Sequence, residues 1–582
     1  MLQLLLVFAT IATGFFVSRT VPTEELLQDR FALGQKYYAA NDHENSVEVF
    51  SEIESTPNYT LLNVDQIEVA IDDLVLPLRV AATYQLGNSY RNVGRTLLAR
   101  ARSIAEGGDI IQARLRRQES LAAFDQARDY YRNLVDDDVR SPRHVRVMSQ
   151  YQIVRASYQT EDYEGVVRES RILLDRFPGS AYEDAALYDR GWAYYHMGSS
   201  RDAIDTFEEL LAVSDDALKR DRSLFQMGES YIQLGELEQA RNAYSGLVNQ
   251  YEFTALSDRE LLEMKAQRLR GLVQETTREL VAKAQIRIAD SFADEGRVSE
   301  AIAAYSKVPE KYPQETLVVQ KSYDNMATMV LEQQGVDPGI RILRQAIEQV
   351  DDIYFRGRAQ LRIAGILFRD ERYRAAIDEY QVYRRAYGSQ TRAIGVGLDE
   401  VLFSEAEAYR ELGRSKNGSA DDLRAARAGY TTIIDHHPFS RRRAEALYGL
   451  GHVHIAAGKI DSAGSVFARA LEENPRATVA PHALSWWART AFQSGDAERA
   501  VDLYRRLIND YPASDLIAST WKDLGLVYMS LGRTAAAVSA LAQVDMRFRA
   551  WPKVQAEAAD MLLAAGRLDD IEDQLRLGQA LE

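Results

Sequence analysis

The sequence predicts an all-α protein built from repeated pairs of helices. Three observations favour this fold class: proline is scarce, good helix formers are abundant, and one pattern recurs about every 37 residues. The 582 residues include only 13 prolines, below the roughly 5% of an average protein, and many Ala, Leu, Arg and Glu, which favour helix. Since 46% of the residues are hydrophobic, the chain can bury large cores. Length alone would suggest about four domains.

The recurring pattern is centred on a glycine that ends the first helix of each pair. The segments Leu224–Gly235, Leu447–Gly458 and Trp521–Gly532 align on this glycine. In each segment a second glycine lies seven positions before the helix-ending glycine, and an aromatic residue or His lies three positions after this second glycine. An Ala follows the helix-ending glycine by five positions. Successive helix-ending glycines lie 37 residues apart in three cases, which are Gly198 to Gly235, Gly458 to Gly495 and Gly495 to Gly532.

Each position of the pattern has a structural reason. Apolar residues fall at i, i+3, i+4 and i+7, which predicts two amphipathic helices of about a dozen residues per unit. The central glycine permits the left-handed conformation that ends a helix. The small residue of the first helix and the Ala of the second let the two backbones approach closely. A dipeptide such as Tyr312-Pro313 or Tyr511-Pro512 closes a unit, because proline cannot continue a helix.

This pattern resembles the tetratricopeptide repeat (TPR), in which a small residue, an aromatic residue, an Ala and a Pro occupy the corresponding positions. The resemblance implies a right-handed α-solenoid of about thirteen helix-turn-helix units, mostly of 34–37 residues, with no single globular core. A Pro-x-Ser step, as in Pro178-Gly179-Ser180, is similar to bacterial envelope TPR proteins of the outer-membrane assembly lipoprotein and Tol-Pal-associated types. The chain departs from the lipoprotein members because it has no cysteine for a lipobox.

The period predicts four regions. Residues 1–20 are expected to be a signal peptide or an N-terminal membrane anchor, because residues 1–17 are apolar and uncharged; the alternative is a packed first helix. Residues 24–252 form an N-terminal TPR array, and residues 253–281 a helical insertion. Residues 282–582 form a C-terminal array that ends in a capping helix.

An Arg-rich break interrupts the N-terminal array near residues 92–119. It is expected to be either an insertion of about twenty residues or a long extended helix. Its six arginines are Arg95, Arg100, Arg102, Arg114, Arg116 and Arg117. They indicate either a solvated helical face or a docking patch for an acidic partner or anionic lipid head groups. A second, short break at residues 414–422 is expected to be a loop, and the unit near residues 322–350 is degenerate.

The sequence offers no recognisable chemistry. The absence of cysteine excludes disulfides, thiolate nucleophiles and Cys-type metal sites. His452 and His454 lie two residues apart on a helix, so they point in different directions and cannot chelate one ion. Phosphate-binding loops and hydrolase or zinc-protease motifs are missing. We therefore expect no enzyme, no cofactor and no metal, and the net charge of −16 argues against nucleic acid as a partner.

Binding of other proteins or peptide segments is the remaining function. TPR proteins bind such partners on the concave face made by their first helices, and the resemblance places a set of aromatic and Arg side chains there. The protein-binding candidates are Tyr151, Arg155, Tyr158, Tyr188, Trp192, Tyr195, Arg222 and Phe225. The alternative is that some of them pack against the neighbouring repeat. A second candidate face comprises Tyr448, His452, His482, Arg489, Phe492 and Met529.

These features predict a non-catalytic TPR scaffold of the bacterial cell envelope. It would face the periplasm, either exported or tethered to a membrane through residues 1–17. The alternative is a cytoplasmic or membrane-peripheral TPR adaptor that regulates a partner enzyme or complex.

Overall fold

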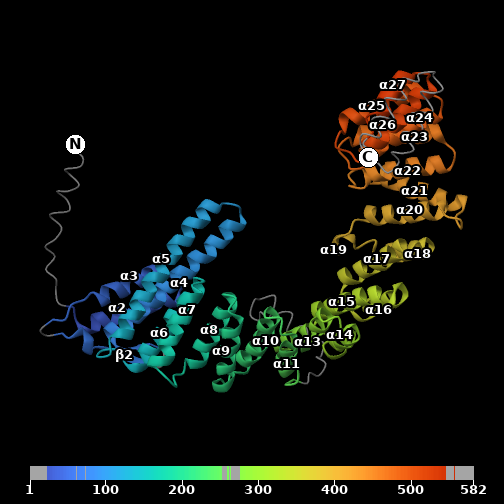
Figure 1. The fold of residues 1–582 in the computed structure, drawn as a ribbon. Coiled ribbons are helices and arrows are strands. Elements are labelled where there is room, and N and C mark those ends of the chain that lie inside the picture. The colour runs from blue at the N-terminus through green and yellow to red at the C-terminus, as the bar shows by residue number, and fades with distance from the viewer. Residues whose placement is uncertain are drawn as a thin grey trace, which may run out of the picture. The chain divides into compact units, whose positions relative to one another are not determined.

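A computed structural model of the chain describes residues 22–59, 62–71, 74–251, 259–260, 263, 276–544 and 556. The chain divides into two compact units, residues 1–314 and residues 315–582 (Figure 1). Within the described residues, twelve successive pairs of antiparallel helices account for nearly all of the secondary structure. The predicted all-α, pairwise helical fold is therefore confirmed. The expected terminal capping helix and thirteenth unit lie outside the described residues.

The first unit contains six helix pairs. They are α2 (Glu24–Ala39) with α3 (His43–Glu54), α4 (Leu78–Glu106) with α5 (Ile110–Asp136), α6 (Arg143–Gln159) with α7 (Tyr163–Arg176), α8 (Glu183–His196) with α9 (Ser200–Val213), α10 (Ala217–Gln233) with α11 (Leu237–Val248), and α13 (Thr277–Asp294) with α14 (Val298–Lys311). Each second helix packs against its own first helix and against the first helix of the next pair, so the core runs continuously along the unit.

The second unit also contains six helix pairs and one short extra helix, α19 (Thr391–Ile394). The pairs are α15 (Thr316–Gln334) with α16 (Val336–Gln349), α17 (Ile353–Arg369) with α18 (Tyr373–Tyr387), α20 (Leu398–Arg414) with α21 (Ala420–His436), α22 (Arg443–Ala456) with α23 (Ile460–Glu473), α24 (Ala480–Gln493) with α25 (Ala497–Asp510), and α26 (Ile517–Ser530) with α27 (Thr534–Leu541). The degenerate stretch near residues 322–350 thus forms an ordinary pair, and a loop separates α20 from α21 as predicted.

A glycine of the first helix faces a bulky side chain of the second helix in several pairs. A Cβ atom added to Gly191 would lie 2.5 Å from the ring of Phe207, which is fully buried. The same arrangement recurs, always 16 residues apart, at Gly34 and Phe50, Gly228 and Tyr244, Gly451 and Phe467, and Gly525 and Leu541. The small residue therefore sets the distance between paired helices, as the repeat predicted.

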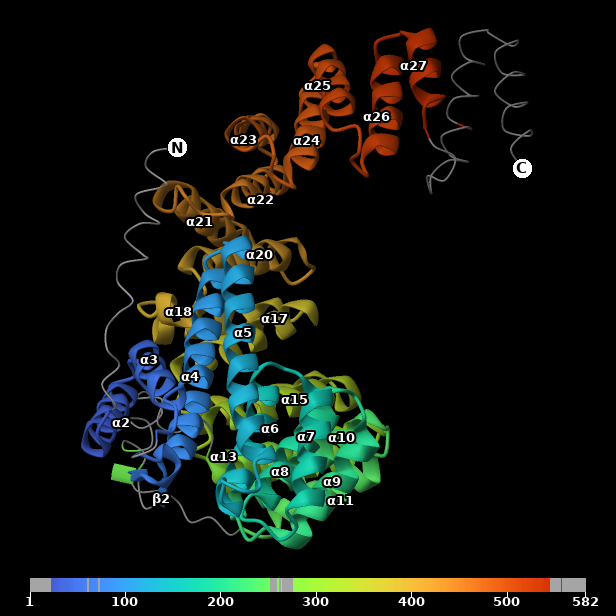
Figure 2. The same cartoon turned by 90° about the vertical axis from the view of Figure 1, so that its left-hand side faces the viewer.

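The Arg-rich break is a pair of long helices, which is the second of the two alternatives. Helices α4 and α5 run side by side as a hairpin (Figures 1 and 2). Here the facing residues are Gly87 and Tyr131, which lie 44 positions apart instead of 16, so the break adds 28 residues. A second contact, between Gly94 and Phe124, lies seven residues later in α4 and seven residues earlier in α5, which is closer to the tip of the hairpin. The extra residues thus lengthen both helices while the original packing is kept.

A small β-hairpin between α3 and α4 was not predicted. Strand β1 (Glu68–Ile71) pairs antiparallel with β2 (Leu74–Pro77), and Val69 lies opposite Leu76. Val69, Ile71 and Leu76 are buried in the core of the first unit. The apolar alternation over four residues per strand is too short to stand out from a helical pattern in a helix-rich sequence.

Two predicted features fall largely on undescribed residues. The expected signal peptide or anchor, residues 1–20, lies outside the described part. So does most of the insertion at residues 253–281, of which residues 277–281 belong to α13. Helix α13 nevertheless packs directly on α10 and α11, so the array continues across this segment. Among the described residues, no helix combines the length and the apolar character that a membrane crossing requires.

Candidate protein-binding surface

The first helices of the first unit form its inner face. Successive first helices α4, α6, α8 and α10 contact each other directly, whereas successive second helices make fewer contacts or none. Because the first helices are the closer set, the array curves toward them. Side chains that leave α6 and α8 on this side therefore converge, and the candidate residues Tyr151, Tyr158, Tyr188 and Trp192 belong to these two helices.

A buried carboxylate links α6 to α8. The Asp189 side chain is only 4% exposed and accepts hydrogen bonds from Arg155 (Nη1 to Oδ1, 3.1 Å) and from the Tyr151 hydroxyl (3.3 Å). Burial raises the pKa of Asp189 above its usual value, and the nearby Arg155 guanidinium opposes this shift. The Tyr151 ring also stacks on Tyr182, with 5.0 Å between ring centroids. Tyr151 and Arg155 therefore hold α6 and α8 in register.

Half-buried aromatic rings continue from this network along α8. The Trp192 ring lies edge-on to Tyr188 (6.3 Å) and Tyr195 (6.0 Å), and it also approaches His196 (5.8 Å). His196 stacks on Tyr163 at 4.8 Å, and Tyr163 contacts Tyr158 at 6.0 Å. We call these six residues, Tyr158, Tyr163, Tyr188, Trp192, Tyr195 and His196, the aromatic cluster.

The aromatic cluster is sheltered but reachable. Trp192 and Tyr195 pack in part on the core formed by Ala203, Ile204 and Phe207, and both keep intermediate exposure. Burial raises the pKa of Tyr158 to about 12, so this hydroxyl stays protonated at physiological pH and can donate a hydrogen bond. Rigid, partly exposed aromatic rings provide large contact areas at a low entropic cost, which suits them to bind a partner.

A groove borders one end of the aromatic cluster. Its volume is about 750 Å³, and it lies between the α4–α5 hairpin and the turn that joins α6 to α7. Its lining comprises Arg95, Leu98, Ala99, Arg102, Arg155, Tyr158, Gln159, Glu161 and Tyr163. Two cluster residues, Tyr158 and Tyr163, thus face an open space of a size that accepts side chains of an extended segment.

The predicted candidates form two groups, and two residues lie outside both. Tyr158, Tyr188, Trp192 and Tyr195 come together in the aromatic cluster, and Tyr151 and Arg155 belong to the Asp189 network. Phe225 packs instead edge-on against the buried Tyr244 of its own helix pair, with 5.5 Å between centroids. Arg222 is half-buried and, among the described residues, has no ion-pair partner. These last two join neither group.

Tyr163, Tyr182, Asp189 and His196 were missed by sequence reasoning. Three of them lie at helix ends or in turns, where the repeat pattern predicts no inward direction. Asp189 could have been found from the sequence, because it follows its partner Arg155 by 34 residues, which is about the length of one repeat. The same spacing separates Arg489 from Asp523, whose side chains also pair (Nη2 to Oδ2, 2.7 Å).

Four residues of the second predicted face, on α22 and α24, contact one another directly or through Trp486. His452 lies between Tyr448 (4.6 Å) and Trp486 (4.8 Å), and burial lowers its pKa to about 4. The Arg489 guanidinium covers Trp486 at 5.1 Å. His482 reaches Tyr448 at 6.4 Å, Phe492 is 37% exposed and Met529 is half-buried. His452 is thus a neutral member of an aromatic layer.

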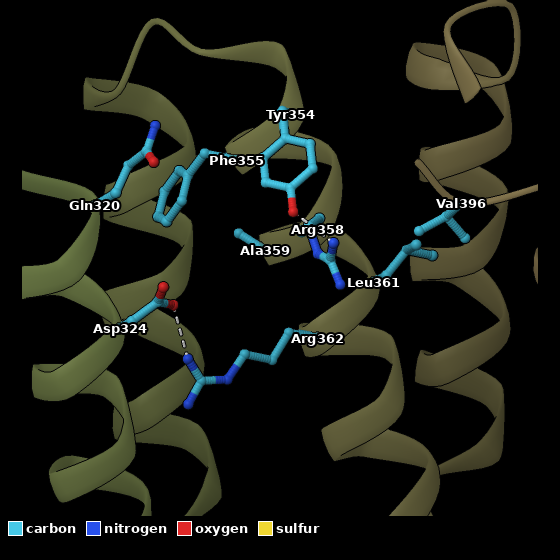
Figure 3. Close-up of a pocket in the computed structure, with 9 residues that line it drawn as sticks. All are labelled: Gln320, Asp324, Tyr354, Phe355, Arg358, Ala359, Leu361, Arg362 and Val396. Carbon is cyan, nitrogen blue, oxygen red and sulfur yellow. Dashed lines mark hydrogen bonds and ion pairs between the residues drawn. The ribbon is translucent and has the colours of Figure 1, made fainter. Parts of the chain in front are cut away.

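A pocket of about 550 Å³ opens between α15 and α17 of the second unit and was not predicted (Figure 3). Arg362 and Asp324 pair across it at 2.9 Å, and Arg358 lies over the Tyr354 ring and donates to its hydroxyl at 2.6 Å. Burial raises the pKa of Asp324, which both arginines oppose. The repeat pattern did not predict the pocket, because one of its walls, α15, belongs to the degenerate unit.

Among the described residues, no group of three or more His, Asp or Glu side chains is arranged to hold a metal ion. What the cluster and its groove can do is bind, through ring faces, a tyrosine hydroxyl and arginine side chains.

Replacing Arg155 by leucine is expected to lower the free energy of unfolding by about 3 kcal/mol, because it leaves the Asp189 charge buried without its cation. A second substitution, Asp189→Asn, should recover most of this loss. The deficit of the single variant should also shrink on acidification, because an acid whose pKa is raised in the folded state stabilises that state as it protonates.

Hydrogen exchange of α6 and α8 measures this effect; Arg533→Leu, read by the exchange of α25 and α27, is the control. The Arg533 pair with Glu498 is exposed (48% and 60%), so its loss should change stability by less than about 1 kcal/mol. Equal effects of the two substitutions would show that Asp189 does not depend on Arg155.

Comparison with known proteins supports the repeat assignment. Models of the tetratricopeptide repeat match residues 185–214, 222–253, 283–315, 418–478 and 482–514. The first of these matches covers α8, which carries most of the aromatic cluster. The search of curated proteins found no match.

Three solved structures are similar to parts of the chain. A tetratricopeptide repeat protein from Parabacteroides merdae is 14% identical, covers 48% of this chain and 98% of its own, and has a TM-score of 0.30. The C-terminal part of a TPR repeat-containing protein from Cytophaga hutchinsonii is 17% identical over 46% of this chain and 98% of its own, with a TM-score of 0.34. Yeast Tom70 is 12% identical over 75% of this chain and 92% of its own, with a TM-score of 0.27.

Proposed function

We propose that this chain, parts of which match models of the tetratricopeptide repeat, is a non-catalytic scaffold that holds extended segments of other proteins on the inner face of its first unit. TPR repeats are in general protein-binding modules. The observation that carries the proposal is the aromatic cluster, whose Tyr158 and Tyr163 rings line an open groove of about 750 Å³ and whose other rings continue along α8.

The groove favours an extended segment with aromatic or aliphatic side chains and some negative charge. Tyr158 and Tyr163 offer ring surfaces, while Arg95 and Arg102 line the opposite wall. Arg102 is 66% exposed, so it can turn toward an acidic side chain of the partner at little cost. Apolar contacts would thus supply most of the affinity, and the arginines the orientation.

Selection from a random peptide library displayed on phage, with the full chain as target, tests this function. We expect binding peptides that share an aromatic or aliphatic residue next to an acidic one. These peptides should protect α6 and α8 from hydrogen exchange. Failure to select any peptide, or protection confined to second helices, would contradict the proposal.

We further propose that the protein works in the bacterial cell envelope, exported or tethered through residues 1–17. The apolar, uncharged composition of this stretch supports the proposal. A fusion of residues 1–30 to a reporter that is active only outside the cytoplasm should be active. An inactive fusion would favour the alternative, a cytoplasmic or membrane-peripheral adaptor that regulates a partner, and would leave the binding proposal untouched.

A further inference from the structure

The α4–α5 hairpin extends beyond the array that it belongs to (Figure 1). Arg102 of α4 and Arg117 of α5 both reach the Glu161 carboxylate in the α6–α7 turn, at 3.6 and 3.2 Å. Beyond this point, residues 103–116 are all exposed except Ile104 and Ala113. The far end of the hairpin is therefore a finger with solvent on all sides.

The root of this finger is held by an unusual residue. Glu161 has a φ of 63°, in the left-handed region where comparable turns carry glycine, as at Gly198 and Gly235. A side chain at such a position costs about 1 kcal/mol or more. At the root of the finger, the Glu161 carboxylate thus pairs with one arginine of each hairpin helix.

The end of the finger is apolar. Ile110 and Ile111 begin α5 and are 59% and 75% exposed, and Leu115 one turn later is 48% exposed. Exposure of these apolar side chains to water is unfavourable, and the short segment that joins the helices does not cover them. The tip therefore offers a small apolar surface that points away from the protein.

Arginines outnumber acidic side chains along the hairpin, although Glu106 and Asp109 lie at its tip. Residues 92–119 contain six arginines and three acidic residues, whereas the whole chain has a net charge of −16. Arg100 and Arg114 have no carboxylate partner within 4.0 Å among the described residues. Arg114 and Arg117 follow Ile111 by about 4.5 and 9 Å along the helix axis, at 1.5 Å per residue. Ile110 and Ile111 thus lie nearest the tip, and the guanidinium groups of Arg114 and Arg117 lie further from it.

We propose that the tip of the α4–α5 hairpin docks on an anionic lipid surface. Ile110, Ile111 and Leu115 would enter the interfacial layer, where apolar groups lie about 5–10 Å deep, and the arginines behind them would bind lipid phosphates. A lipid surface fits this order because its phosphates lie outside an apolar layer that the tip can enter, whereas an acidic protein offers no such layering. The inference is independent of peptide binding by the aromatic cluster.

The absence of cysteine in the chain allows a direct test. Full-length protein with the single substitution Ile111→Cys, labelled with the environment-sensitive dye NBD, is mixed with vesicles of phosphatidylcholine alone or with an equal part of phosphatidylglycerol. We expect a blue-shifted, brighter emission with the anionic vesicles only. The matched control is Glu208→Cys on the exposed side of α9, whose label should not respond.

Charge and apolar contributions are separated by two further variants in the labelled protein. Arg114→Gln with Arg117→Gln should weaken vesicle binding about tenfold or more, and Ile110→Ser with Leu115→Ser should remove the emission shift. Circular dichroism checks that both stay folded. Unshifted emission on anionic vesicles, an equal shift on neutral vesicles, or a shift caused by an acidic protein or a second copy of the chain without lipid would each overturn the proposal.

Discussion

Replacing Trp192 and Tyr195 together by alanine is expected to weaken the binding of selected peptides by at least about thirtyfold, which corresponds to about 2 kcal/mol. Both rings lie in the middle of the aromatic cluster, and Trp192 contacts Tyr188, Tyr195 and His196. Their loss removes two aromatic ring surfaces from the inner face of α8. Isothermal titration of a selected peptide measures the effect.

The fold of this double variant should persist, because Trp192 and Tyr195 are only half-buried. We expect a loss of stability of about 1 kcal/mol from their partial packing on Phe207 and its neighbours. Met197→Ala, a change at the 42% exposed residue that follows α8, is the control and should leave peptide binding unchanged. Unfolding of the double variant would show that the two rings are core residues rather than binding residues.

Phe467→Ala is expected to lower the free energy of unfolding of the second unit by about 3–5 kcal/mol. The Phe467 ring is fully buried, faces Gly451 and contacts Tyr448 (5.8 Å), His452 (5.6 Å) and Trp486 (6.5 Å). Because Gly451 has no side chain that could fill the space, the cavity should persist. In a repeat array the loss should concentrate in α22, α23 and α24.

Phe439→Ala is the matched control for this prediction. Phe439 belongs to the same unit and is 98% exposed, so the same chemical change should alter stability by less than about 0.5 kcal/mol. Hydrogen exchange, measured separately for each helix, gives the loss of stability in both variants. Similar losses in the two variants, or a loss spread evenly over the second unit, would contradict the repeat packing described here.

The repeat itself could be read from the sequence because its positions depend on local backbone geometry. Gly235 and Gly458 both adopt the left-handed conformation, with φ of 75° and 71°, where the pattern predicted a helix end. The small residue seven positions earlier faces a buried side chain, as at Gly228 and Tyr244. Each of these features depends on residues within one unit, so a single sequence contains the signal.

Features that depend on contacts between units could not be read in the same way. The pairing of Arg155 with Asp189 joins two helices, and only its 34-residue spacing hints at it. The long hairpin was predicted only as one of two alternatives, because 28 helical residues can extend two helices or form another element. The pocket around Arg358 forms between two helix pairs, and the pattern of the first pair is too weak to assign a direction to Gln320 and Asp324.

Cross-linking in the native organism tests the central claim, which is that partners bind on the inner face of the first unit. A photoreactive amino acid replaces Tyr188 on α8 or, as the outer-face control, Glu208 on α9, and both variants are irradiated in living cells. We predict that position 188 forms covalent adducts with a small set of partner proteins and that position 208 does not. Adducts from position 208 alone, or equally from both positions, would contradict it.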